Sequence, residues 1–201
     1  MSARILFLED GLCGGKEGAF GHIARTLIYQ HRHEDFEVFY YESETNTFTH
    51  LVETGFKNIV GRNASHLVFC LGHELLIHPE LFETDFHALP IFFKDLKNKI
   101  DAKIHVINFP EFIFEIGTVQ HTNLIQLNKA LHKESQRHDF HYIDMNSICM
   151  DFMKFQQSDQ ATVHRSLHHA KATLNALGQQ FYTCGILENE QFIFPKKEVT
   201  L

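Results

Sequence analysis

Five residues of types that bind divalent metal ions are expected to lie near one another. Asp10, His73, Glu74 and His164 fall in segments that follow strands or precede a helix, and His168 lies one helical turn beyond His164. Two histidines at this spacing, together with carboxylates, suit a divalent metal ion. One hypothesis is therefore a metal site built from Asp10, Glu74, His164 and His168. The other is that these histidines only cover helix surfaces, because the chain contains 16 histidines.

Cys13 is a second residue that could do chemistry. It follows Gly11 and precedes Gly14-Gly15, close to the expected start of a helix. A thiolate near a helix N-terminus can act as a nucleophile. The alternative is a small residue in a glycine turn. The chain has four cysteines and no CxxC pair, so we expect free thiols.

Apolar runs predict the elements that must position these residues. Five short runs, several ended by Gly, Pro or Asp, read as buried strands. They cover residues 4–8, 36–41, 66–71, 103–109 and 140–144.

Helical spacing of apolar residues predicts a helix between or after most of these strands. The expected helices cover residues 17–31, 47–60, 79–100, a stretch through Leu124, Leu127 and Leu131, and 163–177. Pro90 predicts a kink or a break in the third of them. Residues 179–201 could add a C-terminal hairpin.

This alternation predicts an α/β fold, a doubly wound three-layer sandwich with a five-stranded parallel sheet. We expect one domain over residues 1–201, with a core at about 3–178 and an extension at 179–201. Ligands of such sheets bind beyond the carboxyl ends of the strands. The segments to inspect are therefore the loops 10–16, 42–46, 72–79 and 110–117, and the segment before the last expected helix.

Composition excludes several classes of function. The formal charge is −7 and no long Lys/Arg run occurs, which argues against nucleic acid as a partner. No segment has the roughly 18 apolar residues of a membrane span, and the N-terminus does not resemble a signal peptide. We therefore expect a cytoplasmic protein that binds neither nucleic acid nor membrane.

Several segments resemble, in order, the motifs of the SGNH (GDSL-type) hydrolases. The strand that runs into Asp10-Gly11-Leu12 resembles their Gly-Asp-Ser-Leu block, and the strand that runs into Gly72-His73-Glu74 resembles their Gly-x-Asn-Asp block. Residues 104–110, 142–144, Asn123 and Asn128 resemble the later strands and the helix between them, and Val163-His164 resembles the final Asp-x-x-His block. The resemblance implies the SGNH fold, which is flavodoxin-like, and acyl-transfer chemistry.

The catalytic residues implied by this resemblance are mostly replaced. Gly11 stands at the position of the nucleophilic serine, and Thr45 falls near the position of an oxyanion-binding glycine. Glu74 replaces the oxyanion-binding asparagine, Ala161 replaces the aspartate, and only His164 is retained. Without a serine and hydrogen-bond donors for the oxyanion, the family's esterase mechanism is not expected.

Three hypotheses for the function follow. The first is a pseudoenzyme whose strand-end cleft, with Asp10, Gly11, Thr45, His73 and Glu74, binds a small molecule or a protein partner. The second is a diverged hydrolase that acts through Cys13, or through a metal held by Asp10, Glu74 and His164. The third is an assembly or interaction protein. No motif requires a cofactor. A divalent metal ion is the cofactor that these residues could bind.

Overall fold

A five-stranded parallel sheet forms the centre of the molecule. We describe residues 3–9, 36–41 and 47–147 of a computed structural model of the chain. The strands are β1 (Ala3–Glu9), β2 (Phe36–Tyr41), β3 (His66–Cys70), β4 (Lys103–Ile107) and β5 (His141–Ile143). Their order is β2-β1-β3-β4-β5, and every neighbouring pair is parallel. This order is one of the common doubly wound arrangements, so the predicted fold class is confirmed.

The central strands are buried on both faces, as their continuous apolar sequences predict. Residues 5–8 of β1 and 67–70 of β3 have at most 1% of their surface exposed. Because successive side chains of a strand point to opposite faces, each strand contributes to two layers of core.

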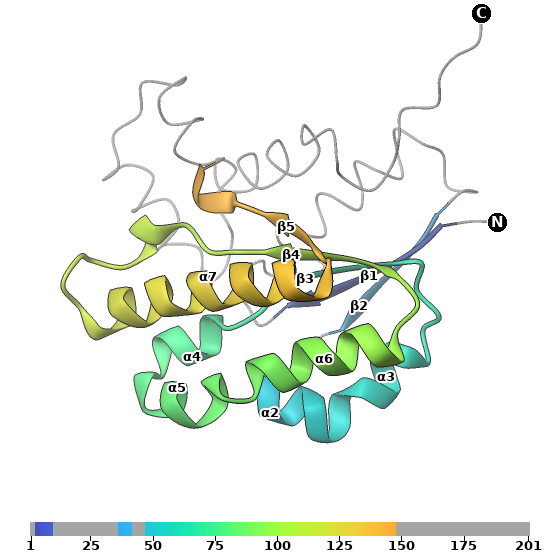
Figure 1. The fold of residues 1–201 in the computed structure, drawn as a ribbon, viewed down its shortest axis with the longest axis horizontal. Coiled ribbons are helices and arrows are strands. Elements are labelled where there is room, and N and C mark those ends of the chain that lie inside the picture. The colour runs from blue at the N-terminus through green and yellow to red at the C-terminus, as the bar shows by residue number, and fades with distance from the viewer. Residues whose placement is uncertain (1–2, 10–35, 42–46, 148–201) are drawn as a thin grey trace, which may run out of the picture.

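Helices α6 (Leu89–Lys99) and α7 (Val119–His138) lie together on one face of this sheet (Figure 1). Phe69 of β3 contacts Phe92 and Phe93 of α6, with ring centroids 5.7 and 5.5 Å apart. Phe92 also contacts Phe48 and Phe56, so one aromatic cluster joins the sheet to two helical segments. The predicted helices at 17–31 and 163–177 and the predicted C-terminal hairpin lie outside the described residues.

The predicted helix at 47–60 is present, with an irregularity that the sequence did not indicate. It consists of α2 (Phe48–His50), a π-helical turn η3 (Leu51–Gly55) and α3 (Phe56–Val60), and Gly61 follows its end. Asp85 of α5 (Pro79–Phe86) caps the start of α2. The carboxylate oxygens of Asp85 accept hydrogen bonds from the amides of Phe48 and Thr49 at 2.8 and 2.7 Å.

The break expected at Pro90 is confirmed. The stretch 79–100 forms α5 (Pro79–Phe86) and α6, which begins at Leu89. Pro90 lies in the first turn of α6, where a helix needs no amide hydrogen from it.

Two loops predicted at the strand ends contain short helices. The stretch 72–79 holds α4 (His73–Ile77), and the stretch 110–117 holds a 3-10 turn, η4 (Glu111–Ile113). Strands β3, β4 and β5 are also shorter than predicted. After β4, the Phe109 amide bonds a side chain of α7 and not another strand. No helix among the described residues is long and apolar enough to cross a membrane.

Candidate functional site

The carboxyl ends of β3, β4 and β5 form one polar edge of the sheet. At the end of β3, Gly72 adopts a left-handed conformation with φ of 115° and precedes α4. A Cβ atom at Gly72 would lie 2.5 Å from Cδ2 of Leu127 on α7. Only glycine fits both the conformation and this close approach, so this turn directs His73 and Glu74 into the first turn of α4.

Glu74 offers a carboxylate at this edge. Its side chain is 35% exposed, and its Oε2 lies 3.8 Å from Nε2 of His78, one turn later on the same helical segment. The other ring nitrogen of His78 lies 3.4 Å from Glu80. An ionised carboxylate accepts hydrogen bonds and has no proton to donate. The Glu74 carboxylate is therefore a candidate hydrogen-bond acceptor at this edge.

Asn108 and Asp144 link the ends of β4 and β5. Asn108 is buried and donates a hydrogen bond from Nδ2 to Oδ1 of Asp144 at 2.9 Å. Its Oδ1 accepts a bond of 2.6 Å from the Met145 amide. The Ser147 hydroxyl donates to Oδ2 of Asp144 at 2.6 Å. These bonds hold the residues after β5 against the residue after β4.

These hydrogen bonds also determine the charge of Asp144. Burial alone would raise the pKa of this carboxyl, but bonds from Ser147 and Asn108 outweigh it and hold the pKa below its usual range. Burial, and then the Asp144 charge, raise the pKa of the Tyr142 hydroxyl. At neutral pH this edge therefore carries an ionised Asp144 next to a protonated tyrosine.

The side chain of Asn128 of α7 binds the backbone at the same edge of the sheet. Its side chain accepts a bond from the Phe109 amide at 3.1 Å and donates one to the Phe109 carbonyl at 2.7 Å. Asn128 thus satisfies both backbone groups of Phe109 as the chain leaves the sheet. The asparagines noted in the sequence lie on α7, where Asn123 is also buried.

Of the predicted site residues, His73 and Glu74 are adjacent at the start of α4. Asp10, Gly11, Cys13, Thr45, His164 and His168 lie outside the described residues, as does Ala161. The register pairs Glu9, the last residue of β1, with Cys70, so β1 ends at this same edge. Within the described ranges, no group of three or more His, Cys, Asp or Glu side chains could hold a metal ion.

Asn108 and Asp144 are residues of this edge that the sequence analysis did not include among its candidates. Each directly follows an apolar strand, and a polar residue at such a position was the available signal. Their pairing across 36 residues depends on β4 and β5 being neighbours.

The strand order and the parallel pairing define a doubly wound α/β domain whose β3, β4 and β5 end at a polar edge. Solved structures identify the fold more narrowly. A catalytic mutant of the acetylxylan esterase Axe2 from Geobacillus stearothermophilus has a TM-score of 0.71 at 12% identity, covering 96% of this chain and 97% of that chain. The acetyl xylan esterase AlAXEase has the same TM-score and identity, with 92% and 98% coverage. A structure described as a GDSL-like lipase, from Parabacteroides merdae, has a TM-score of 0.68 at 15% identity, with 93% and 94% coverage.

The chain therefore has an SGNH (GDSL) hydrolase-like fold, as the resemblance of its motifs implied. No protein-family model matches the sequence, and no curated protein matches it either.

Proposed function

We propose that this chain is an SGNH-fold pseudoenzyme that binds a small molecule at its strand-end edge and has no serine-esterase activity. The observation that carries the proposal is the carboxylate of Glu74 at the position where the family motif has a hydrogen-bond donor. A negative charge there opposes the oxyanion of an acyl-transfer transition state.

The structural neighbours support the same reading. Catalytic mutants of Axe2 replace a serine, an aspartate or a histidine by alanine. In the motifs that resemble the family, this chain has Gly11 for the serine and Ala161 for the aspartate, and it keeps His164. A histidine without a nucleophile to deprotonate supplies little acyl transfer.

Hydrolysis of p-nitrophenyl acetate tests the proposed absence of serine-esterase activity. We expect the wild-type protein and the His164→Ala variant to release nitrophenol at the same rate as buffer. Hydrolysis above background that is lost in His164→Ala would contradict the proposal, because it would require a working histidine.

The chemistry of Glu74 narrows the class of ligand. Its carboxylate accepts hydrogen bonds from hydroxyl or N–H groups and repels anions. Asn108 and Asp144 are bonded to each other and hold the edge in shape. Axe2 variants are described as acetyl-xylooligosaccharide esterases, whose substrates are neutral and rich in hydroxyl groups. We therefore expect a neutral saccharide of this kind to bind.

Calorimetric titration with xylo-oligosaccharides tests the proposed binding of a neutral saccharide. We expect Glu74→Gln to weaken binding by roughly tenfold, since a hydrogen bond to a charged group contributes about 1.5–3 kcal/mol. Glu80→Gln is the matched control, because Glu80 also lies beside His78 but is 69% exposed and outside the first turn of α4. Equal affinity of wild type and Glu74→Gln would contradict a role for this carboxylate.

A second candidate is a diverged hydrolase that uses Cys13, or a metal held by Asp10, Glu74 and His164. The partly exposed carboxylate of Glu74 at the strand-end edge favours the metal version, because carboxylates are metal ligands. Stoichiometric metal in protein purified without a histidine tag, or labelling of Cys13 by iodoacetamide, would support this candidate over the first.

A protein partner is the remaining possibility that a specific observation favours. Ile116, shortly before α7, and Val119, its first residue, are 83% and 61% exposed. A chain that stays monomeric and co-purifies with no other protein would argue against an assembly function.

A further inference from the structure

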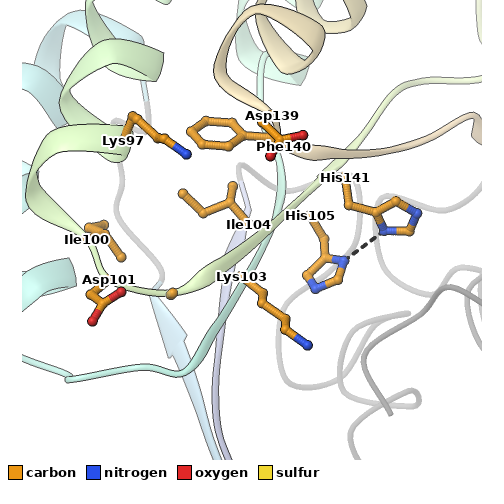
Figure 2. Close-up of a pocket in the computed structure, with 10 residues that line it drawn as sticks. Lys97, Ile100, Asp101, Lys103, Ile104, His105, Asp139, Phe140 and His141 are labelled. Atoms are coloured by element: carbon orange, nitrogen blue, oxygen red, sulfur yellow. Dashed lines mark hydrogen bonds between the residues drawn. The ribbon is translucent and has the colours of Figure 1, made fainter. Parts of the chain in front are cut away.

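A cavity of about 510 Å³ opens where β4 and β5 begin, at the end of the sheet opposite to the polar edge. Its walls come from the last turn of α6, the connection to β4, the first residues of β4 and the turn between α7 and β5 (Figure 2). This volume lies in the range of sites that bind small molecules. None of the described residues of the polar edge lines the cavity, so a ligand here is independent of the proposed function.

One side of this cavity is an apolar wall, formed by Ile100, Ile104 and Phe140. Ile104 is only 5% exposed, and the other two are half-buried. The Phe140 ring packs against the rings of Phe93 on α6 and His138 on α7, with centroids 5.6 and 5.7 Å apart. These contacts hold the wall in place before a ligand arrives, which lowers the entropy cost of binding.

Asp139 is fixed at the cavity by the turn that ends α7. Its backbone is left-handed, with φ of 59°, and glycine is the usual residue at such a helix end. The amides of Asp139 and Phe140 donate hydrogen bonds to the carbonyls of Gln136 and Ser135, at 3.4 and 2.9 Å. This bonding fixes the backbone from which an exposed carboxylate lines the cavity.

Charged side chains of both signs line the cavity without neutralising one another. Lys97, Asp101 and Asp139 are all exposed, and within the described part of the chain none of the three takes part in an ion pair. The Lys97 side chain extends toward Phe140, whereas that of Lys103 points away from it (Figure 2). A ligand that touches the apolar wall can therefore meet one cation and two carboxylates.

We propose that this cavity binds an apolar α-amino acid in its zwitterionic form. The carboxylate of the ligand accepts hydrogen bonds from the Lys97 ammonium group, and its own ammonium group donates to Asp101 and Asp139. Its side chain covers the apolar wall. The carbonyl ends of α6 and α7, which carry partial negative charge, also lie at this cavity and favour the ammonium group. A ligand with only one of the two charges leaves part of this lining without a partner.

A titration of the ¹⁵N-labelled full chain with L-phenylalanine, followed by NMR, tests the site. We expect saturable shifts of the amide signals of residues 97–104 and 139–141, which include the cavity lining. N-acetyl-L-phenylalanine lacks the ammonium group and phenethylamine lacks the carboxylate, so each should bind at least tenfold more weakly. Equal affinity for all three compounds would overturn the proposal. It would also be overturned if these signals did not shift up to the solubility limit of the amino acid.

Variants at exposed positions make the test specific. We expect Lys97→Gln to weaken binding of L-phenylalanine at least tenfold. Lys94→Gln is the matched control, because Lys94 is also exposed on α6 but does not line the cavity, and it should bind as the wild type does.

The two carboxylates are tested together. Asn tolerates the left-handed conformation of residue 139, so Asp139→Asn combined with Asp101→Asn removes both charges and keeps the turn. We expect this double variant to lose most of the preference for L-phenylalanine over N-acetyl-L-phenylalanine. Wild-type affinity in Lys97→Gln, or an unchanged preference in the double variant, would overturn the proposal.

Discussion

Gly72 is the single residue on which the geometry after β3 depends most directly. Two separate costs would follow from adding a side chain there, one for the left-handed backbone and one for the contact with Leu127. We expect Gly72→Ala to lower the free energy of unfolding by about 2–3 kcal/mol, because a left-handed non-glycine residue alone costs about 1–3 kcal/mol. Urea denaturation monitored by circular dichroism measures the change.

Gly117→Ala separates the two costs. Gly117 also has a positive φ, of 92°, but a Cβ there would meet nothing within 4 Å. We therefore expect a smaller loss of stability, from the backbone alone. Equal losses in the two variants would show that the approach of Leu127 to Gly72 adds no cost.

The helical elements are held to one another by a buried carboxylate. Asp85 of α5 caps the first turn of α2. Asp85→Ala would leave two backbone amides without their acceptor, one of them buried. We expect a loss of about 2 kcal/mol in the free energy of unfolding, again measured in urea.

Asp95→Ala is the control for Asp85→Ala. Asp95 of α6 pairs with Lys99 one turn away at 2.7 Å, and Lys99 is 46% exposed. Ion pairs of this kind contribute little, so we expect a loss below about 0.5 kcal/mol. A comparable loss in both variants would contradict a special role for the cap.

At the scale of the whole molecule, the half-buried His66 of β3 and the buried His105 of β4 make the free energy of unfolding depend on pH. Burial lowers the pKa of His66 to about 4 and that of His105 to about 3, whereas an unfolded histidine titrates near 6.5. As the pH falls below 6.5, the unfolded chain takes up protons that the folded chain does not. The contribution of these two histidines to the free energy of unfolding is therefore fully present above about pH 6.5. It is lost as the pH falls toward 4 and below.

Urea midpoints at pH 7, 6, 5 and 4 measure this dependence. We expect His105 alone to lower the free energy of unfolding by about 1 kcal/mol per pH unit between pH 6 and 4. His105→Gln should give a shallower slope, corresponding to about one proton fewer. An unchanged slope in that variant would contradict the assignment to His105.

Much of the fold could be predicted from local patterns. The apolar runs indicated all five strands, and Pro90 indicated the break between α5 and α6, because burial on both faces and a missing amide hydrogen act on the residues themselves. The π-helical turn at Leu51–Gly55 had no such signal. Helix α4 follows from the turn at Gly72, whose packing against Leu127 is a contact across the fold.

The sequence by itself determined which residue types stand in the motifs that resemble the SGNH hydrolases, since Gly11, Glu74 and Ala161 can be read directly. Only the tertiary structure decided which polar residues meet. Asn108 and Asp144 are paired, as are His105 and His141, each across 36 residues. These residues meet although they are far apart along the chain, because β4 and β5 are parallel neighbours. Which strands are neighbours depends on the packing of the whole sheet.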